Sequence, residues 1–299
     1  MKWIPALLLL VAVGCATPAP DPDAGAINPL AFEIEARNGN RAVLFGSVHV
    51  GRIGEWKLPR RLEQALRDAQ VLVLEIDLTG VEPGELGELM QSMGAMPPGK
   101  RLRQVVSAET WALLEVRAPD IGMSLDDIQH YKPWVVALHF MGRSMTRAGF
   151  ETAQGVESRL VARDDEIPIR GLETPFEQFS VFDSLPYPVQ DRVLLDALDP
   201  QTQGPGFDSL VEAWSRGDAR RLEAIVFHHR DDPLLARYYD EAFDRRHLRM
   251  AEAIDGILAE GGGAFVVVGA GHLVGRRSLQ AVLLDQGYRV RQLSGMPVR

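Results

Sequence analysis

Two histidines occur in the same local context near the two ends of the chain. The stretch "VLFGSVHVG" (43–51) ends an apolar run in glycine, two residues and His49, and "AFVVVGAGHLVG" (264–275) repeats this spacing up to His272. Glycines at these positions let the backbone turn sharply and approach a ligand closely. In an open α/β sheet, ligands bind where loops leave the carboxyl ends of the strands. If both runs are parallel strands of one sheet, His49 and His272 lie at the same edge of it.

Glu75 interrupts the apolar run "VLVLEIDL" (71–78), which has the composition of a buried strand. A buried carboxylate without a partner is costly, so Glu75 requires a cation, a histidine or a metal ion beside it. Two imidazoles and one carboxylate can ligate a divalent metal with an open position, and such a metal lowers the pKa of bound water to about 7. We therefore expect His49, Glu75 and His272 to hold a divalent ion (Mn, Co or Zn) and to activate water. The alternative for Glu75 is a buried ion pair with Arg246.

The elements that would position these residues predict an α/β fold. Residues 31–50 read as a β-hairpin around Asn38-Gly39, a favoured tight-turn pair. A helix over 58–69 and a strand over 71–78 follow, and together with the hairpin's second strand they form a βαβ unit whose two strands should be parallel neighbours.

The middle of the chain is predicted to be helical, and strands return at the carboxyl end. We therefore expect a sheet with a parallel βαβ core built from N- and C-terminal strands, around a long helical middle segment. Apolar periodicity predicts helices over 105–118, 133–149, 155–166, 175–185, 188–198, 209–229, 233–260 and 276–287, with strands over 167–173, 264–268 and 288–293.

The N-terminus has the features of an export signal. Residues 1–15 combine an early lysine with an apolar stretch that is shorter than the about 20 residues a membrane-spanning helix needs. Residues 11–15 resemble the lipobox of bacterial lipoproteins, in which a cysteine such as Cys15 is acylated. Cys15 is the only cysteine, so no disulfide is expected. Residues 16–29 then form a Pro-rich tether, and 30–299 form the folded domain.

These features predict an exported protein that is lipid-anchored in the bacterial cell envelope. Ala16 follows the cysteine, and by analogy with other lipoproteins this places the protein in the outer membrane, on the periplasmic face. The net charge of −9 argues against a nucleic-acid partner, because binding phosphates needs a basic face.

The order and spacing of the motifs resemble the TraB/GumN group, which includes the TIKI metalloproteases. This group is distantly similar to erythromycin esterases and ChaN-like haem lipoproteins. The resemblance covers roughly residues 30–293. The matching stretches are Gly46–His49, Val73–Ile76, Lys132–Trp134, Gly155–Glu157, Gly171–Glu173 with Glu177 and Gln178, Trp214–Asp218, Arg246–Met250 and Val268–Gly275.

The resemblance implies a metal-dependent, peptidase-like hydrolase that acts on a peptide or small-molecule substrate. It also implies that Arg246 belongs to the site, where it would neutralise the oxyanion of a tetrahedral intermediate. Glu157, Glu173 and His247 are possible additional site residues. For Glu157, the dipole of a helix first turn explains the carboxylate equally, and for Glu173 the alternative is a helix cap. The group often has Asp at Glu157 and Asn at His247.

Two other functions remain open at this stage. One is a metal-free hydrolase of the erythromycin-esterase type, in which a histidine oriented by Glu75 activates water as a general base. The other is a haem- or metal-binding lipoprotein without catalysis, in which histidines at the sheet edge ligate the iron.

Overall fold

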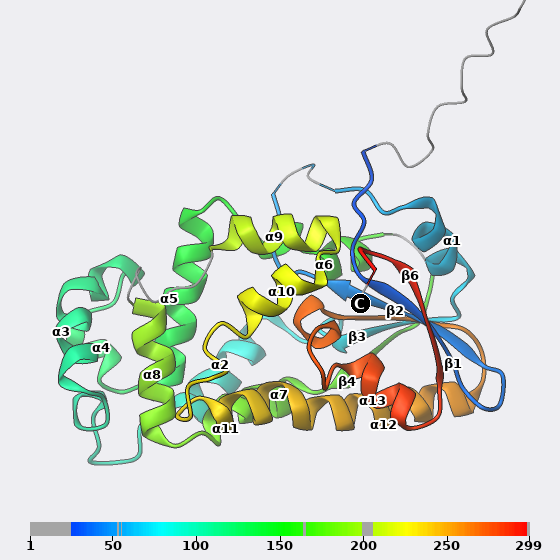
Figure 1. Cartoon of the computed structure of the whole chain (residues 1–299). Helices are drawn as coiled ribbons and strands as arrows, with labels where there is room; N and C mark the ends of the chain where they lie inside the picture. Colours follow the sequence, from blue (N-terminus) through cyan, green and yellow to red (C-terminus); the bar gives the residue numbers. More distant parts are fainter. Residues whose placement is uncertain (1–24, 53, 55, 164–165, 199–205, 298–299) are drawn as a thin grey trace, which may run out of the picture.

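Six strands form one sheet in the order β4-β3-β5-β2-β1-β6, and helices surround it (Figure 1). The computed structural model describes residues 25–52, 54, 56–163, 166–198 and 206–297. The predicted α/β class is confirmed. The strands are β1 Ala31–Glu35, β2 Arg41–Ser47, β3 Val71–Ile76, β4 Ile169–Glu173, β5 Ala264–Gly269 and β6 Arg289–Ser294. The predicted signal sequence, Cys15 and most of the tether lie outside the described residues, whereas Ile27 is buried against the domain.

The predicted hairpin is confirmed. β1 pairs with β2 in antiparallel register, and the turn between them contains Gly39 at φ 87°. That backbone conformation favours glycine. β6 pairs antiparallel with β1 and forms the edge of the sheet on this side, while β2, β5, β3 and β4 run parallel to one another.

The expectation that the first two parallel strands are neighbours is wrong, because β5 lies between β2 and β3. β5 is buried along Ala264–Val268, and such a continuous apolar strand requires a neighbour on each side and cover on both faces. Ser47 of β2 lies opposite Gly269 of β5, so the segments that carry His49 and His272 leave the same edge of the sheet, as predicted.

All the predicted helical segments contain helices, most of them with shorter bounds, whereas α8 and α9 begin one and two residues earlier than predicted. The segment 209–229 divides into two helices at Gly217, which has φ 63°, and the segment 233–260 contains a π-helical turn, Asp240–Asp244. Two helices, α2 and α4, lie in segments for which no helix was predicted. The helices are α1 Arg60–Asp68, α2 Pro83–Gly94, α3 Ala108–Arg117, α4 Leu125–Ile128, α5 Pro133–Arg147, α6 Val156–Val161, α7 Pro175–Asp183, α8 Tyr187–Leu198, α9 Phe207–Arg216, α10 Ala219–Val226, α11 Ala236–Tyr239, α12 Arg245–Glu260 and α13 Leu279–Asp285.

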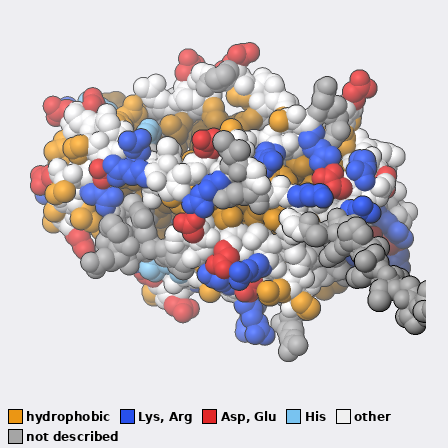
Figure 2. Space-filling view, turned by 90° about the horizontal axis from the view of Figure 1, so that it is seen from above, with side chains coloured by type: hydrophobic (Ala, Val, Ile, Leu, Met, Phe, Trp, Pro, Cys, Tyr) orange, Lys and Arg blue, Asp and Glu red, His pale blue; other side chains and the backbone are white. Residues whose placement is uncertain are grey.

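The helical middle segment extends away from the sheet. Figure 1 shows α3, α4, α5 and α8 together at one end of the molecule, and α12 running along the lower side from the sheet towards them. Charged side chains of both signs, with hydrophobic ones between them, cover the face seen from above (Figure 2). None of the helices in the described part of the chain combines the length and the hydropathy of a bilayer-spanning segment.

Candidate active site

His49 lies just beyond the end of β2 and pairs with Glu157 of α6. Its Nδ1 is 2.9 Å from Glu157 Oε1, and the same oxygen accepts a hydrogen bond from the Ser47 hydroxyl. The His49 side chain is 61% exposed, so its remaining ring nitrogen, Nε2, is the one available to an incoming molecule. Desolvation is the largest single effect and opposes protonation of His49, but the charge and hydrogen bond of Glu157, together with the Glu75 carboxylate, raise the pKa of His49 to about 9.

The start of α6 explains why Glu157 reaches this position. The Val156 N–H donates to the Val48 carbonyl at 3.0 Å, which joins the helix to the backbone beside His49. A Cβ at Gly155 would come within 2.4 Å of the His49 carbonyl oxygen, so only glycine permits this approach. Glu157 therefore has a specific partner in addition to the favourable dipole of the helix first turn.

Glu75 projects from β3 and is almost fully buried, with 5% of the residue exposed. Its Oε1 accepts from the Gly269 N–H at 2.5 Å, and its Oε2 accepts from Arg246 Nη2 at 2.9 Å and from Gln178 Nε2 at 3.3 Å. Burial alone would raise the pKa of Glu75, but His272 and the Arg246 guanidinium beside it lower that pKa below its ordinary range. The buried ion pair with Arg246, one of the two expectations for Glu75, is present.

Arg246 joins Glu75 to a second buried carboxylate, that of Glu173 at the end of β4. Its Nε and Nη2 donate to Glu173 Oε2 at 2.9 and 2.6 Å, and its Nη1 faces the Ala242 carbonyl at 3.3 Å and His272 Nε2 at 3.2 Å. All three nitrogens of the guanidinium are thus engaged within the protein. Arg246 is the second residue after the π-helical turn of residues 240–244, a distortion that is frequent at functional sites.

His272 lies in the short 3-10 helix Ala270–Leu273 after β5 and is buried, with 4% exposed. Its Nδ1 is 2.9 Å from His247 Nε2, and His247 Nδ1 is 2.6 Å from the Arg277 carbonyl oxygen. Burial lowers the pKa of His272 to about 3, against the opposing effect of the Glu75 carboxylate. Burial likewise lowers the pKa of His247 to about 4. Both imidazoles are therefore neutral at physiological pH.

Gly269 marks the point at which the three predicted ligands converge. A Cβ placed on Gly269 would lie 3.2 Å from Glu75 Oε1, 3.3 Å from His49 Nε2 and 3.8 Å from His272 Cδ2. The glycine of the second motif is therefore needed for space: it leaves room for three polar side chains that come from the ends of three different strands.

Apart from Cys15, the predicted site residues fall into two hydrogen-bonded groups that meet at Gly269, but not always for the predicted reason. One group is His49 with Glu157, and the other is Glu75, Glu173, Arg246, His247 and His272. Glu173 does not cap α7, because Thr174 is the cap residue and forms a capping box with Glu177. Sequence reasoning missed Ser47 and Gln178, which contact Glu157 and Glu75. Both belong to stretches that matched the TraB/GumN pattern, and a polar residue within such a stretch was the available signal.

The donor set fits a divalent metal in its chemistry. His49 and His272 each have Nδ1 engaged by a protein partner, a carboxylate in one case and an imidazole in the other, which is the usual arrangement for metal-binding histidines. Each leaves Nε2, and Glu75 adds a carboxylate oxygen. Arg246 Nη1 contacts His272 Nε2 and would have to give up this contact. In the described residues, as they stand, no group of His, Cys, Asp and Glu side chains is close enough together to form a metal site.

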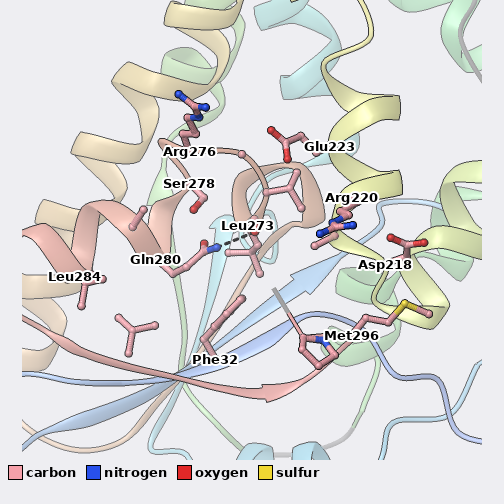
Figure 3. A pocket seen from close by; sticks show the side chains of 16 residues that line it. Phe32, Asp218, Arg220, Glu223, Leu273, Arg276, Ser278, Gln280, Leu284 and Met296 are labelled. Atoms are coloured by element: carbon pink, nitrogen blue, oxygen red, sulfur yellow. Dashed lines mark hydrogen bonds between the residues drawn. The ribbon is translucent and has the colours of Figure 1, made fainter. Parts of the chain in front are cut away.

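A separate cavity of about 730 Å³ lies beside the 3-10 helix that carries His272. Leu273, the next residue, lines it together with Phe32 of β1, while Arg220, Glu223 and Arg276 stand around it (Figure 3). None of the residues around Gly269 lines this cavity, so it is distinct from the cluster described above.

Comparison with known proteins gives the family of the chain. Residues 30–292 match the model of the TraB/PrgY/gumN family. An uncharacterized protein, YbaP, of Shigella flexneri is 22% identical over 258 residues, which cover 85% of this chain and 91% of the relative. YbaP of Escherichia coli (strain K12) is 24% identical over 251 residues, with 82% and 89% covered. No solved structure matches. Because the match spans almost the whole folded region, the chain belongs to the TraB/PrgY/gumN family.

Proposed function

We propose that this protein is a divalent-metal-dependent hydrolase, peptidase-like in its chemistry, that is tethered to the bacterial envelope through Cys15. The observation that carries the proposal is the convergence of His49 Nε2, Glu75 Oε1 and the His272 ring on Gly269. Two imidazoles and a carboxylate would hold the ion, and a bound divalent ion supplies Lewis acidity and a hydroxide-like nucleophile at neutral pH.

The residues of the chain have separate tasks in this proposal. Glu157 holds His49 through Nδ1, which directs Nε2 towards Gly269, and His49 is the exposed member of the cluster that an incoming substrate meets. Glu75 provides an ionised carboxylate whose position is set by the Gly269 N–H and by Arg246. Burial of Glu75 and His272 keeps bulk water from the inner side of the site.

Arg246 acts in this proposal by positioning its neighbours. Its N–H groups are directed at Glu75, Glu173, His272 and the Ala242 carbonyl, so none is left to polarise a substrate carbonyl except the Nη1–H that metal ligation by His272 would release. This differs from the oxyanion role that the family resemblance suggested. The guanidinium allows two carboxylates to stay ionised side by side in a buried place, which they could not do without a paired cation.

One observation favours a second candidate, an acid–base hydrolase that works without metal. Arg246 Nη1 lies 3.2 Å from His272 Nε2, where the lone pair needed for metal ligation is engaged. In this reading, His49 acts in its deprotonated form, which its pKa of about 9 favours at alkaline pH: Nε2 takes the proton from water, and Glu157 stabilises the imidazolium that forms, as a carboxylate does in a catalytic triad.

A hydrolysis assay with and without a chelator distinguishes the metal-dependent hydrolase from the metal-free acid–base hydrolase. The purified protein is incubated with a library of quenched fluorescent peptides and a panel of activated esters, before and after treatment with a chelator and after return of Mn²⁺, Co²⁺ or Zn²⁺. The metal proposal expects hydrolysis that the chelator abolishes and one metal restores. Hydrolysis that is insensitive to the chelator supports the second candidate. His49→Ala should be inactive in either case, whereas His228→Ala, which removes an exposed histidine outside the cluster, should keep full activity.

A further inference from the structure

His272 Nε2 faces two groups that make opposite demands on it. Arg246 Nη1, a donor, lies 3.2 Å away, and Glu75 Oε1, an acceptor, lies 3.4 Å away. A neutral imidazole carries its proton on one of its two nitrogens. With the proton on Nδ1, Nε2 accepts from Arg246; with the proton on Nε2, it donates to Glu75. The contacts at this end of the ring therefore do not decide which tautomer is present.

The contacts at the other end of the ring do decide it. His247 Nδ1 lies 2.6 Å from the Arg277 carbonyl oxygen, which can only accept, so this nitrogen carries the His247 proton. Neutral His247 then has a lone pair on Nε2, and this atom lies 2.9 Å from His272 Nδ1. His272 Nδ1 must be the donor, and its Nε2 is left without a proton. His247 is only 1% exposed, so water does not compete for these bonds.

The carbonyl at the start of this chain of hydrogen bonds is itself held in place. Arg277 donates from Nη1 to Asp244 Oδ2 at 2.7 Å, and Asp244 lies one turn before His247 on the same helical segment. The side chain of Arg277 and its backbone carbonyl are thus both attached to this segment. These two attachments fix the loop after His272 against the helix that bears His247. The Arg277 carbonyl thereby determines which nitrogen of His247 donates, and His247 in turn determines which nitrogen of His272 donates.

We propose that His247 is a positioning residue that fixes His272 as the Nδ1-protonated tautomer and presents the Nε2 lone pair to the site. The inference deepens the proposed function and rests on it for its purpose, since an unprotonated Nε2 is what metal ligation or proton acceptance requires. The hydrogen-bond chain itself exists independently of any metal or substrate.

Two substitutions separate this role from simple packing. His247→Phe keeps a ring of similar size but removes the acceptor, which leaves the buried Nδ1–H of His272 without a partner and makes donation from Nε2 to Glu75 the better choice. His247→Gln keeps both functions, because its amide oxygen can accept from His272 and its NH₂ group can donate to the Arg277 carbonyl. A packing role predicts that Phe is the better replacement, and the tautomer role predicts that Gln is.

The test is the tautomer of His272, read from two-bond ¹H–¹⁵N correlations in metal-free, substrate-free protein with ¹⁵N-labelled histidine. His139, whose Nδ1 lies 2.9 Å from the Val135 carbonyl oxygen, serves as an internal reference. We expect the Nδ1-protonated form in the parent and in His247→Gln. In His247→Phe the tautomer ratio should shift by about tenfold or more towards Nε2–H, as the loss of a buried hydrogen bond implies.

The opposite results would overturn the inference. These are an Nε2-protonated His272 in the parent or in His247→Gln, or an unchanged tautomer in a folded His247→Phe. Thermal unfolding checks the fold, and if the Phe variant does not fold, the parent and the Gln variant still decide the question. Because no metal, substrate or turnover enters the measurement, its outcome is independent of whether the protein proves to be a hydrolase.

Discussion

Ser47 lies directly opposite Gly269 in the parallel pairing of β2 with β5. This register brings together two sequence motifs that are more than 200 residues apart, because each strand delivers its histidine a few residues beyond the paired position. Ser47 then contacts Glu157, and Gly269 donates its N–H to Glu75. Ser47 and Gly269 thus each hold in place, by a hydrogen bond, one of the carboxylates beside the histidines: Glu157 beside His49 and Glu75 beside His272.

Gly269→Ala should abolish most of the activity while leaving the protein folded. The new Cβ would lie 3.2 Å from Glu75 Oε1 and 3.3 Å from His49 Nε2, so one of them must move. Overpacking of this kind costs about 1–3 kcal/mol of stability, which chemical denaturation measures beside the assay. Gly256→Ala is the matched control, because a Cβ there meets open space on α12 and should stabilise the helix. Full activity in Gly269→Ala would contradict the convergence of the three side chains.

Arg246→Met should destabilise the protein by about 3–5 kcal/mol at neutral pH, because it leaves Glu75 buried without its cation and Glu173 with only the more distant Arg249. The lowered pKa of Glu75 means that the ion pair stabilises the fold above the ordinary carboxyl pKa and that this contribution fades as the pH falls towards the folded-state value. The difference between variant and parent should therefore shrink in acid. Urea unfolding at several pH values measures it. Arg249→Met, which removes only the 43% exposed partner that lies 3.7 Å from Glu173, is the control for losing an outer cation.

His49 should titrate near pH 9 in the metal-free protein. Its pKa is raised to about 9 from 6.5, so the ion pair with Glu157 stabilises the fold fully below pH 6.5, and this contribution is lost as the pH rises through about 9. If His49 must lose its proton to act, activity rises over the same range. NMR titration of the histidine gives the pKa directly. Glu157→Gln should move it back towards 6.5, whereas a titration near 6.5 in the parent would refute the pairing.

Trp214→Phe should lower the stability of the protein by removing a hydrogen bond to Gly46, the glycine of the motif that carries His49. Trp214 is buried, and its Nε1 donates to the Gly46 carbonyl at 2.8 Å, so the substitution leaves that carbonyl unpaired at a cost of about 1–3 kcal/mol. Trp111→Phe is the control, since the Trp111 indole bonds to Glu115 on an exposed helix face and its loss should stay within about 0.5 kcal/mol. Equal destabilisation by the two substitutions would show that the buried bond to Gly46 contributes no more to stability than the exposed bond to Glu115.

The local signals in the sequence were sufficient for the hairpin, the main helices and the meeting of His49 with His272. Each rests on a short pattern: Asn-Gly between alternating residues, apolar periodicity, or glycine and histidine after a β-branched run. The position of β5 between β2 and β3 could not be predicted in this way, because it depends on pairing between distant segments. The continuous apolar run of β5 indicates a strand in the interior of the sheet, but it does not indicate which two strands lie beside it.

The polar network was predictable in its members but not in its connections. A buried Glu75 demanded a partner, and Arg246 was a candidate, yet nothing in the sequence indicates that one guanidinium serves Glu75, Glu173 and His272 together. That arrangement depends on the π-helical turn before Arg246 and on the side-chain directions of three strands. Likewise, Thr174 and Glu173 are adjacent in sequence, and only the backbone geometry decides which one caps α7.

The most direct test of the central claim is the metal content of the purified protein. The protein, prepared without a metal-affinity tag, is dialysed with Mn²⁺, Co²⁺ or Zn²⁺ in turn, and bound ions are counted by elemental analysis. His49→Ala, His272→Ala and Glu75→Gln are treated in parallel, with His228→Ala as the control. We predict about one ion per chain in the parent and the control, and its loss in the three site variants. No bound ion with any of the metals, or equal binding by the site variants, would contradict the claim that the two glycine-framed histidines meet at a metal.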